Sequence, residues 1–254
     1  MGNMVVTGCA SGIGKAVADH HAAQGHKIIG IDLKNADIEA DLSTLEGRQA
    51  AIDAALELSG NEIDGLVTAA GMGGHLADGK LVAIVNYFGT VELLDGLFPA
   101  MQGRPNASAV ALSSNSAQFR IDPDDPVIDA LLAHDIDKVS ELVGDQPSYM
   151  TYGKSKHAVS RAVRQRAGEW GAAGVRLNAI APGQTETPLL QGTRDNPELK
   201  EMLAAVPIPL QRTASADEIA RIIVSMMGEE LSFMHGSIVF VDGGTDALLR
   251  PDGF

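Results

Sequence analysis

A tyrosine and a lysine four positions apart are the residues best suited to chemistry. They lie in Tyr152-Gly153-Lys154-Ser155-Lys156, which opens a long stretch of helical periodicity. Residues four apart on a helix share a face, so the Lys156 ammonium can approach the Tyr152 phenol. A nearby positive charge favours the ionised phenol and lowers its pKa from the usual value of about 10. The pair therefore predicts a side chain that donates or accepts a proton near neutral pH.

A serine that could share this chemistry follows a predicted strand. Residues 107–112 alternate small and apolar side chains, and Ser113-Ser114-Asn115-Ser116 comes directly after them. Because a parallel sheet binds ligands at the carboxyl ends of its strands, we expect the Ser114 hydroxyl to bind the same substrate oxygen as Tyr152. A Tyr and a Lys at this spacing also occur by chance in many helices, so the interpretation depends on a cofactor site.

The stretch from Thr7 to Gly14 predicts such a site. It places Gly8, Gly12 and Gly14 between the apolar run at residues 4–6 and an amphipathic segment. Glycines in a strand-to-helix turn let the backbone approach a ligand closely, and the first N–H groups of the helix favour a diphosphate. An ordinary glycine-rich turn is the alternative, since three glycines alone do not define a nucleotide site.

An acidic residue at the end of the next predicted strand favours the nucleotide interpretation. The strand at residues 27–32 ends in Asp32, about 20 residues beyond the glycines. A carboxylate there accepts hydrogen bonds from the adenine ribose hydroxyls and repels a 2′-phosphate. Leu33 stands where a phosphate-binding enzyme would have Arg or Lys, so we expect NAD rather than NADP. Lys15 and Lys34 lie nearby and leave some capacity for NADP open.

Strands alternate with helices along the rest of the chain, which predicts one α/β domain over residues 1–254. The expected fold is Rossmann-type, a doubly wound parallel sheet with helices on both faces. Residues 122–147 interrupt the alternation with two apolar stripes and predict an inserted helical hairpin at about 120–148, packed on its own domain or on a partner. Residues 189–203 are partly apolar, and their composition indicates a mobile lid.

Composition and charge exclude several classes of protein. The chain is 45% apolar and 20% charged, as expected for a globular core, and it carries a net charge of −14. This charge repels nucleic acid, anionic membranes and acidic carrier proteins, so we expect none of them as partners. No stretch approaches the roughly 18 consecutive apolar residues of a membrane span. Cys9 is the only cysteine, which indicates a reducing cytoplasmic compartment and leaves no cysteine metal cluster.

The chain resembles the short-chain dehydrogenase/reductase family over essentially its whole length. The motifs are Thr7-Gly8-x-x-x-Gly12-x-Gly14, Asp32, Asn86, Ser114, Tyr152-x-x-x-Lys156 and Pro182-Gly183. The resemblance implies that Tyr152 is the general acid/base, that Ser114 positions the carbonyl or hydroxyl, and that Lys156 holds the nicotinamide ribose. It also implies that Asn86 anchors a water in a proton relay and that Thr187 contacts the carboxamide.

Two departures from the family pattern are visible. The usual Asn-Asn-Ala-Gly is Thr68-Ala69-Ala70-Gly71 here, and Tyr152 follows Ser114 by 38 positions (152 − 114), which is long for the family. The long insert makes the chain similar to the branch of bacterial 3α-hydroxysteroid dehydrogenase/carbonyl reductases. In that branch the hairpin covers a face that other members use to form tetramers. The resemblance therefore implies a homodimer, with a tetramer, or a hairpin without consequence for assembly, as alternatives.

The sequence thus predicts reversible NAD-dependent hydride transfer between a secondary alcohol and a ketone. The expected substrate is a small apolar alcohol or ketone, cyclic or steroid-like. A smaller alcohol, an aryl ketone or a sugar is the alternative, and a non-catalytic NAD sensor or scaffold is a third. The catalytic candidates are Asn86, Ser114, Tyr152 and Lys156. The cofactor candidates are Gly8, Ser11, Gly12, Ile13, Gly14, Asp32, Leu33, Asp41, Leu42, Ala70, Gly71, Tyr152, Lys156, Pro182, Gly183, Thr185 and Thr187. The substrate candidates are Asn115, Gln184, Leu189, Leu190 and Met202, and no metal is expected.

Overall fold

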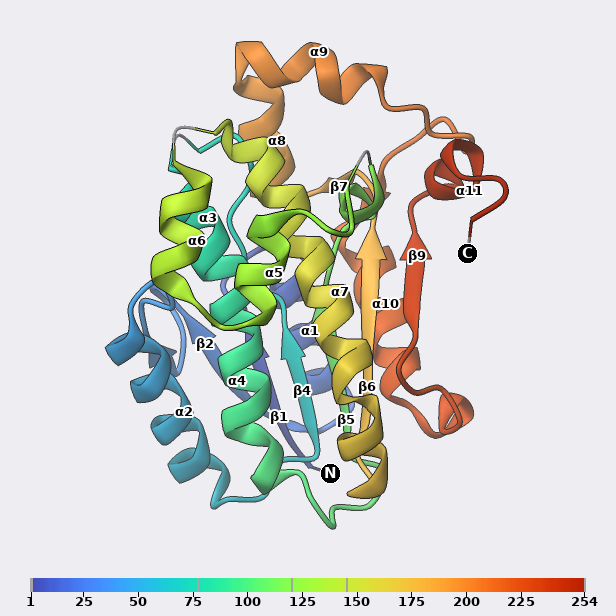
Figure 1. Ribbon diagram of the computed structural model, residues 1–254. Coiled ribbons are helices and arrows are strands. Elements are labelled where there is room, and N and C mark those ends of the chain that lie inside the picture. The colour runs from blue at the N-terminus through green and yellow to red at the C-terminus, as the bar shows by residue number, and fades with distance from the viewer. Residues whose placement is uncertain (1, 77, 120, 145, 254) are drawn as a thin grey trace.

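A parallel sheet with helices on both faces forms the molecule (Figure 1). The computed structural model describes residues 2–253 except 77, 120 and 145. Among these residues seven strands form one sheet in the order β3-β2-β1-β4-β5-β6-β9, and every pairing between neighbours is parallel. The order reverses beside β1, as in a doubly wound fold. The predicted fold class is confirmed.

The strands are short and largely buried. Those of the main sheet are β1 (Asn3–Thr7), β2 (Lys27–Asp32), β3 (Ile38–Glu39), β4 (Gly65–Thr68), β5 (Ser108–Leu112), β6 (Arg176–Pro182) and β9 (Ile238–Val241). A two-stranded sheet pairs β7 (Thr185–Glu186) with β8 (Ala214–Ser215). β4, β5 and β6 are buried at every position, because a parallel sheet is covered on both faces. The predicted strands are present, and β3 is an addition that the sequence pattern did not indicate.

Helices cover the sheet in two layers. They are α1 (Gly12–Ala23), α2 (Leu45–Ser59), α3 (Gly79–Ala83), α4 (Gly89–Leu97), α5 (Pro126–Leu132), α6 (Ile136–Val143), α7 (Ser148–Ala172), α8 (Pro188–Asp195), α9 (Pro197–Ala205), α10 (Ala216–Met227) and α11 (Thr245–Leu249). α1 and α10 pack together on one face, while α2, α4 and α7 lie on the other (Figure 1). Two apolar clusters, one on each face of the sheet, fill the space between the layers.

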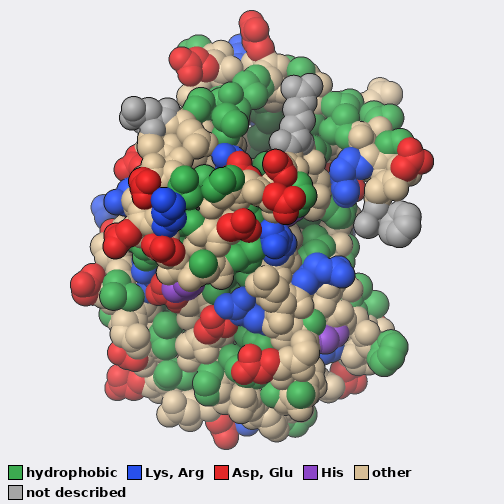
Figure 2. Space-filling view, viewed as in Figure 1, with side chains coloured by type: hydrophobic (Ala, Val, Ile, Leu, Met, Phe, Trp, Pro, Cys, Tyr) green, Lys and Arg blue, Asp and Glu red, His purple; other side chains and the backbone are tan. Residues whose placement is uncertain are grey.

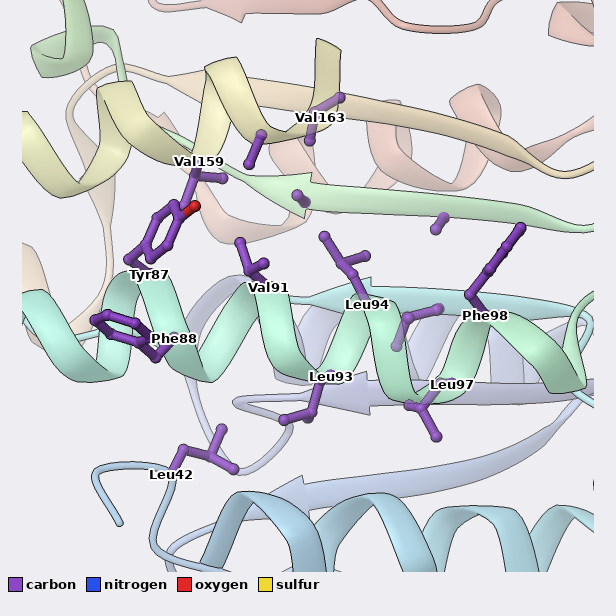
Figure 3. Packing of buried hydrophobic residues seen from close by; sticks show 14 of the residues in the cluster. Leu42, Tyr87, Phe88, Val91, Leu93, Leu94, Leu97, Phe98, Val159 and Val163 are labelled. Carbon is purple, nitrogen blue, oxygen red and sulfur yellow. The ribbon is translucent and has the colours of Figure 1, made fainter. Parts of the chain in front are cut away.

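The helical run at residues 79–100 supplies much of the larger cluster. Tyr87, Val91 and Leu94 point toward α7, where Val159 and Val163 lie, and Leu93 points toward the side of α2 (Figure 3). By length and composition alone the run Gly79–Ala100 could cross a membrane, but 78% of its apolar window is buried inside the protein. It is therefore a core helix. Its apolar character serves packing against α2 and α7.

The predicted hairpin insert is present as α5 and α6. Asp125 and Asp135 cap the two helices by accepting hydrogen bonds from Val127 N and Lys138 N. Both apolar stripes are buried in the larger cluster of the same chain, through Val127, Ile128, Leu131, Val139 and Val143. α5 packs on α7 and α6 packs on α3. The hairpin thus covers its own domain; Arg120 and Asp145 within the predicted range lie outside the described residues.

The structure differs from the sequence-based expectation in three further segments. Residues 189–203 lie within the two regular helices α8 and α9, because Thr187 and Asn196 cap them and a proline follows each cap. α7 begins at Ser148, so Tyr152 lies in its second turn instead of at its start. Residues Ile84–Phe88 form a π-helical turn between α3 and α4, and Asn86 lies in it. Such turns interrupt α-helices frequently at functional sites.

Candidate active site

A cleft of about 1360 Å³ lies at the carboxyl ends of the strands. Strand register places these ends side by side, since Thr7 pairs with Thr68 and Ile31, and Leu112 pairs with Ile180. The face shown in Figure 2 is hollowed below α9, where hydrophobic side chains surround the opening. With the exception of Asn86, all the candidate catalytic, cofactor and substrate residues line this cleft.

The glycine loop forms one end of the cleft. Gly8 and Gly12 adopt φ angles of +69° and +55°, the left-handed region that glycine enters without steric cost. A side chain on Gly14 would collide with the carbonyl oxygen of Gly8, so this glycine lets α1 lie directly against the end of β1. A Cβ on Gly12 would lie 3.2 Å from Cγ2 of Thr187. The loop and the start of α8 therefore face each other across a narrow gap.

Asp32 is held at the end of β2 by two backbone donors. Its Oδ2 accepts a hydrogen bond from Ala10 N at 2.9 Å and its Oδ1 accepts one from Leu33 N at 2.7 Å. Each carboxylate oxygen keeps a second lone pair, so both can still accept from a hydroxyl. The Leu33 side chain is 61% exposed at the rim and offers no positive charge to a 2′-phosphate.

Tyr152 and Ser114 meet inside the cleft, but the expected lowering of the tyrosine pKa is wrong. Burial raises the pKa of the Tyr152 phenol above 10, and the hydrogen bond with the Ser114 side chain lowers it only in part. The Ser114 oxygen also accepts hydrogen bonds from Ser116 N at 3.2 Å and Ser116 Oγ at 2.9 Å. In this arrangement the phenol remains protonated at neutral pH and is ready to donate its proton.

Lys156 is fixed at the end of β5. Its Nζ donates a hydrogen bond to the carbonyl oxygen of Leu112 at 2.8 Å, and the residue is 4% exposed. Burial lowers the pKa of Lys156 to about 8. Gly71 lies against this ammonium, because a Cβ there would be 3.5 Å from Nζ and 3.1 Å from Oδ1 of Asn86. Because residue 71 is glycine and has no side chain, the Lys156 ammonium is open toward the cleft.

Asn86 lies behind the cleft and is completely buried. Its Oδ1 accepts a hydrogen bond from Met72 N at 2.7 Å, and its Nδ2 donates to Met72 O at 3.0 Å and to Ser155 Oγ at 3.3 Å. The amide side chain therefore fixes the loop after β4 to α7. Thr7 Oγ1 holds the same loop by accepting from Ala70 N at 2.9 Å. Asn86 thus holds this loop and does not line the cleft.

The substrate candidates lie at the outer end of the cleft. Gln184 is fixed by donating to Leu203 O at 2.9 Å, and Asn115 is 7% exposed beside Asp242. Leu190 is 6% exposed and Met202 is 48% exposed, so α8 and α9 give an apolar cover. The sequence interpretation missed further apolar lining from three other segments, namely Phe119, Ile121, Tyr149, Met150 and Leu249. Tyr149 lies about one helical turn before Tyr152, and this spacing was a signal that could have identified it.

Among the described residues, no group of three or more His, Cys, Asp and Glu side chains is placed to hold a metal ion. Cys9 lies beside Gly30, and burial with the nearby Asp32 raises the pKa of its thiol to about 11. The thiol is therefore not a nucleophile at neutral pH. Tyr152, Ser114 and Lys156 are the candidate acid/base residues that line the cleft.

Known proteins with similar sequences include dehydrogenases and reductases. A family model described as short chain dehydrogenase matches residues 2–122, and one described as Enoyl-(Acyl carrier protein) reductase matches residues 138–246. The chain is 42% identical over 257 residues to 3-alpha-hydroxysteroid dehydrogenase/carbonyl reductase of Comamonas testosteroni, covering 100% of both chains. It is 32% identical over 258 residues to coniferyl-alcohol dehydrogenase of Pseudomonas sp. strain HR199, covering 95% of each.

A solved structure shares the fold almost completely. The crystal structure of 3-alpha-hydroxysteroid dehydrogenase from Pseudomonas sp. B-0831, complexed with NADH, superposes with a TM-score of 0.97 at 43% sequence identity. The match covers 99% of this chain and 100% of that one. The insert, the glycine loop and the segments that line the cleft thus fall within the matched part of the chain.

Proposed function

The chain belongs to the short-chain dehydrogenase/reductase family, and from this premise we propose that it transfers hydride reversibly between NAD(H) and a secondary alcohol or ketone of an apolar, cyclic, steroid-like substrate. The resemblance seen in the sequence motifs is confirmed, and the chain is an oxidoreductase of that family. The substrate and the roles of individual residues form the proposed part.

The proposal rests on one observation: Ser114 and Tyr152 meet in a cleft that the glycine loop and Asp32 also line. In the reducing direction, the protonated Tyr152 donates its proton to the carbonyl oxygen of the substrate, and the Ser114 hydroxyl holds that oxygen by a hydrogen bond. In the oxidising direction, the same phenol must first lose its proton to accept that of the alcohol. Lys156, open toward the cleft beside Gly71, supplies the positive charge that favours the ionised phenol once substrate and cofactor are bound.

The residues of the inner cleft fit a dinucleotide. Gly14 has no room for a side chain, and Gly8 and Gly12 adopt left-handed φ angles. The loop therefore presents bare backbone to the cleft, which suits a diphosphate. NAD, when bound, supplies the hydride acceptor and NADH the donor. Asp32 would hold the adenine ribose, and Asp41 and Leu42, which also line the cleft, would lie beside the adenine. Ala70, Gly71, Lys156, Pro182, Gly183, Thr185 and Thr187 would surround the nicotinamide half. Ser11, Ile13 and Leu33 complete the proposed set.

The outer cleft supports an apolar substrate. Tyr149, Leu189, Leu190, Met202 and Leu249 present hydrophobic surface there, with Asn115 and Gln184 as polar contacts. Burying a rigid ring system against these side chains gives binding energy without the loss of much conformational entropy. The two hydroxysteroid dehydrogenases that match over the full chain support the same class of substrate.

An aryl alcohol is the second candidate substrate, because the chain is also 32% identical to coniferyl-alcohol dehydrogenase. The purified protein should therefore be assayed with NAD and NADP against a 3-hydroxysteroid, coniferyl alcohol and cyclohexanol. The proposal expects the highest kcat/KM with NAD and the hydroxysteroid. Equal kcat/KM values for the steroid and cyclohexanol would overturn the steroid class. A protein that binds NAD and turns over none of the three would be a sensor or scaffold.

We further propose that the 254 residues form one cytoplasmic domain that assembles as a homodimer. The hairpin covers parts of α3 and α7, which are then not free to contact another subunit. The single cysteine fits a reducing compartment. Sedimentation equilibrium of the purified protein tests the assembly, with a mass of twice 26.5 kDa expected. A tetramer would show that the hairpin does not prevent the larger assembly.

A further inference from the structure

Lys154 connects the catalytic helix to both ends of the hairpin insert. It is 8% exposed, and its Nζ lies 2.9 Å from Oδ2 of Asp125 and 3.0 Å from Oε1 of Gln146. Asp125 begins the hairpin as the cap of α5, and Gln146 follows the end of α6. Gln146 is itself anchored to the hairpin by donating from Nε2 to Leu142 O at 2.7 Å. One buried ammonium thus holds the entry and the exit of the insert.

Two further side chains of α7 hold the segment that leads into the hairpin. The Nδ1 of His157 donates to Ala117 O at 2.8 Å, and the NH1 of Arg161 donates to Pro123 O at 2.8 Å. Lys154, His157 and Arg161 are spaced by three and four residues, so they share one face of α7. Among the three, Lys154 is the side chain that is both buried and ion-paired within 3 Å.

The segment held in this way forms the outer wall of the cleft. The wall consists of the lining residues Gln118, Phe119, Ile121, Asp122 and Asp125. It rests directly on the catalytic helix, because a Cβ on Gly153 would lie 3.1 Å from Cδ1 of Ile121 and 3.3 Å from Ser116 O. Three consecutive residues of α7 therefore have distinct positions. Tyr152 lies in the reaction site, Gly153 lies under the wall, and Lys154 binds the end of the wall at Asp125.

Packing alone does not require an ion pair between a buried lysine and a partly buried aspartate at this point. Replacing such a pair by apolar groups of similar volume is often neutral or stabilising, whereas removing one partner leaves the other charge uncompensated. The retained pair is therefore expected to define a geometry more than to add stability. What it defines here is the distance between the wall and Tyr152.

We propose that Lys154 is a positioning residue that fixes the outer wall of the substrate pocket and thereby makes the enzyme selective for large ring systems over small ketones. This inference rests on the proposed function. A small ketone reaches Ser114 and Tyr152 without touching the wall, whereas the body of a fused-ring substrate must lie against it. Displacement of the wall therefore affects the KM of the large substrate and leaves the chemistry of the small one unchanged.

Lys154→Met is the direct test. With NADH as reductant, the KM for a saturated 3-oxosteroid should rise about tenfold or more, while kcat with cyclohexanone and the KM for NADH stay within about twofold. Lys138→Met is the matched control, since Lys138 pairs with Glu141 on the exposed side of the hairpin and its loss should change none of these values. An equal rise of KM for both ketones, or unchanged values for both, would overturn the proposal.

A double variant separates positioning from stability. Asp125→Asn keeps an acceptor for Val127 N and removes the charge that Lys154→Met leaves unpaired. The double variant should regain the Tm that Lys154→Met loses and should keep the high KM for the oxosteroid. Recovery of both would show that Lys154 contributes stability alone. Hydrogen exchange of residues 117–125 gives a readout free of turnover: exchange should accelerate in Lys154→Met and not in Lys138→Met. If the wild type reduces neither ketone, the proposed function fails, whereas the exchange result still tests whether Lys154 holds the wall in place.

Discussion

The ammonium of Lys156 lies 2.8 Å from the carbonyl oxygen of Leu112, the last residue of β5. This hydrogen bond joins the helix that carries Tyr152 to the strand that leads to Ser114. Tyr152 and Ser114, which we propose to act on one substrate oxygen, thus lie on two elements that this lysine joins. A change in that lysine should therefore alter activity and the pH dependence of stability in separate ways.

Replacing Lys156 by Met should reduce kcat/KM by about 100-fold or more, because the charge that favours the ionised phenol is lost. The melting temperature should stay equal to that of the wild type or rise. The folded protein buries an ammonium whose pKa is lowered to about 8, and a neutral side chain avoids that cost. Activity assays and thermal unfolding at pH 7 test both parts. Lys156→Arg keeps the charge and should be the less stable variant, because its larger head does not fit the buried position.

The same lysine predicts how stability varies above pH 8. Its pKa is about 8 in the folded protein and 10.5 without burial. Between these values the unfolded chain binds one more proton than the folded one, so the free energy of unfolding gains a contribution that increases with pH. Lys156→Met should lack this increase. Urea unfolding of both proteins between pH 7.5 and pH 10 provides the comparison, and parallel curves would contradict the assignment.

Tyr152→Phe should lower kcat by about 100-fold or more in both directions, with the affinity for NADH unchanged. In the wild type, the raised pKa of Tyr152 keeps the phenol protonated through neutral pH. The reduction rate should therefore be flat with respect to this group between pH 6 and pH 9, whereas the oxidation rate should climb with pH. An oxidation profile that is flat over the same range would show that another group takes the proton.

Asp32→Asn should raise the KM for NAD by about tenfold or more, since each hydrogen bond to a carboxylate is worth roughly 1.5–3 kcal/mol. The preference for NAD over NADP should fall at the same time, because the carboxylate no longer repels a 2′-phosphate. Combining Asp32→Asn with Leu33→Arg should reverse the preference, as Leu33 is exposed at the rim. A wild-type enzyme that prefers NADP would contradict the role of Asp32.

His21 should make the protein sensitive to mild acid. The residue is 3% exposed on α1, and burial together with the neighbouring His26 lowers the pKa of its imidazole to about 4 from 6.5. The folded state thus holds His21 neutral. Its contribution to stability is present in full above pH 6.5 and is lost as the pH falls toward 4. His21→Leu should flatten the dependence of unfolding free energy on pH in that window, and His20→Leu, on the exposed side beside Asp217, serves as the comparison.

The sequence predicted the structure correctly where the type of a residue is explained by its immediate neighbours along the chain. Glycines 8, 12 and 14 and Asp32 follow predictable strands, so their meeting at the sheet edge could be foreseen from the parallel order. The two apolar stripes of the hairpin also identified α5 and α6 correctly. In these cases spacing along the chain translates directly into proximity in space.

Other features depend on burial and on distant partners, which spacing does not report. The pKa of Tyr152 moves upward because of burial, and the hydrogen bond with Ser114 opposes that shift only in part. The π-helical turn at Asn86 requires the loop at Met72 that its side chain holds. The contacts of Lys154 with Asp125 and Gln146 join residues up to 29 positions apart (154 − 125). Each of these needed the assembled structure.

The central position of β1 also bears on how the chain is made. β1 pairs with β2 on one side and with β4 on the other, so its second edge stays open until residue 68 has left the ribosome. The cleft is finished later still, since Leu249 and Arg250 contribute its last wall. Pairing over such long separations is slow and leaves an unpaired strand edge that can aggregate. We therefore expect β1 to be exposed to aggregation early in synthesis, and the cleft to be closed only after residue 250 has been made.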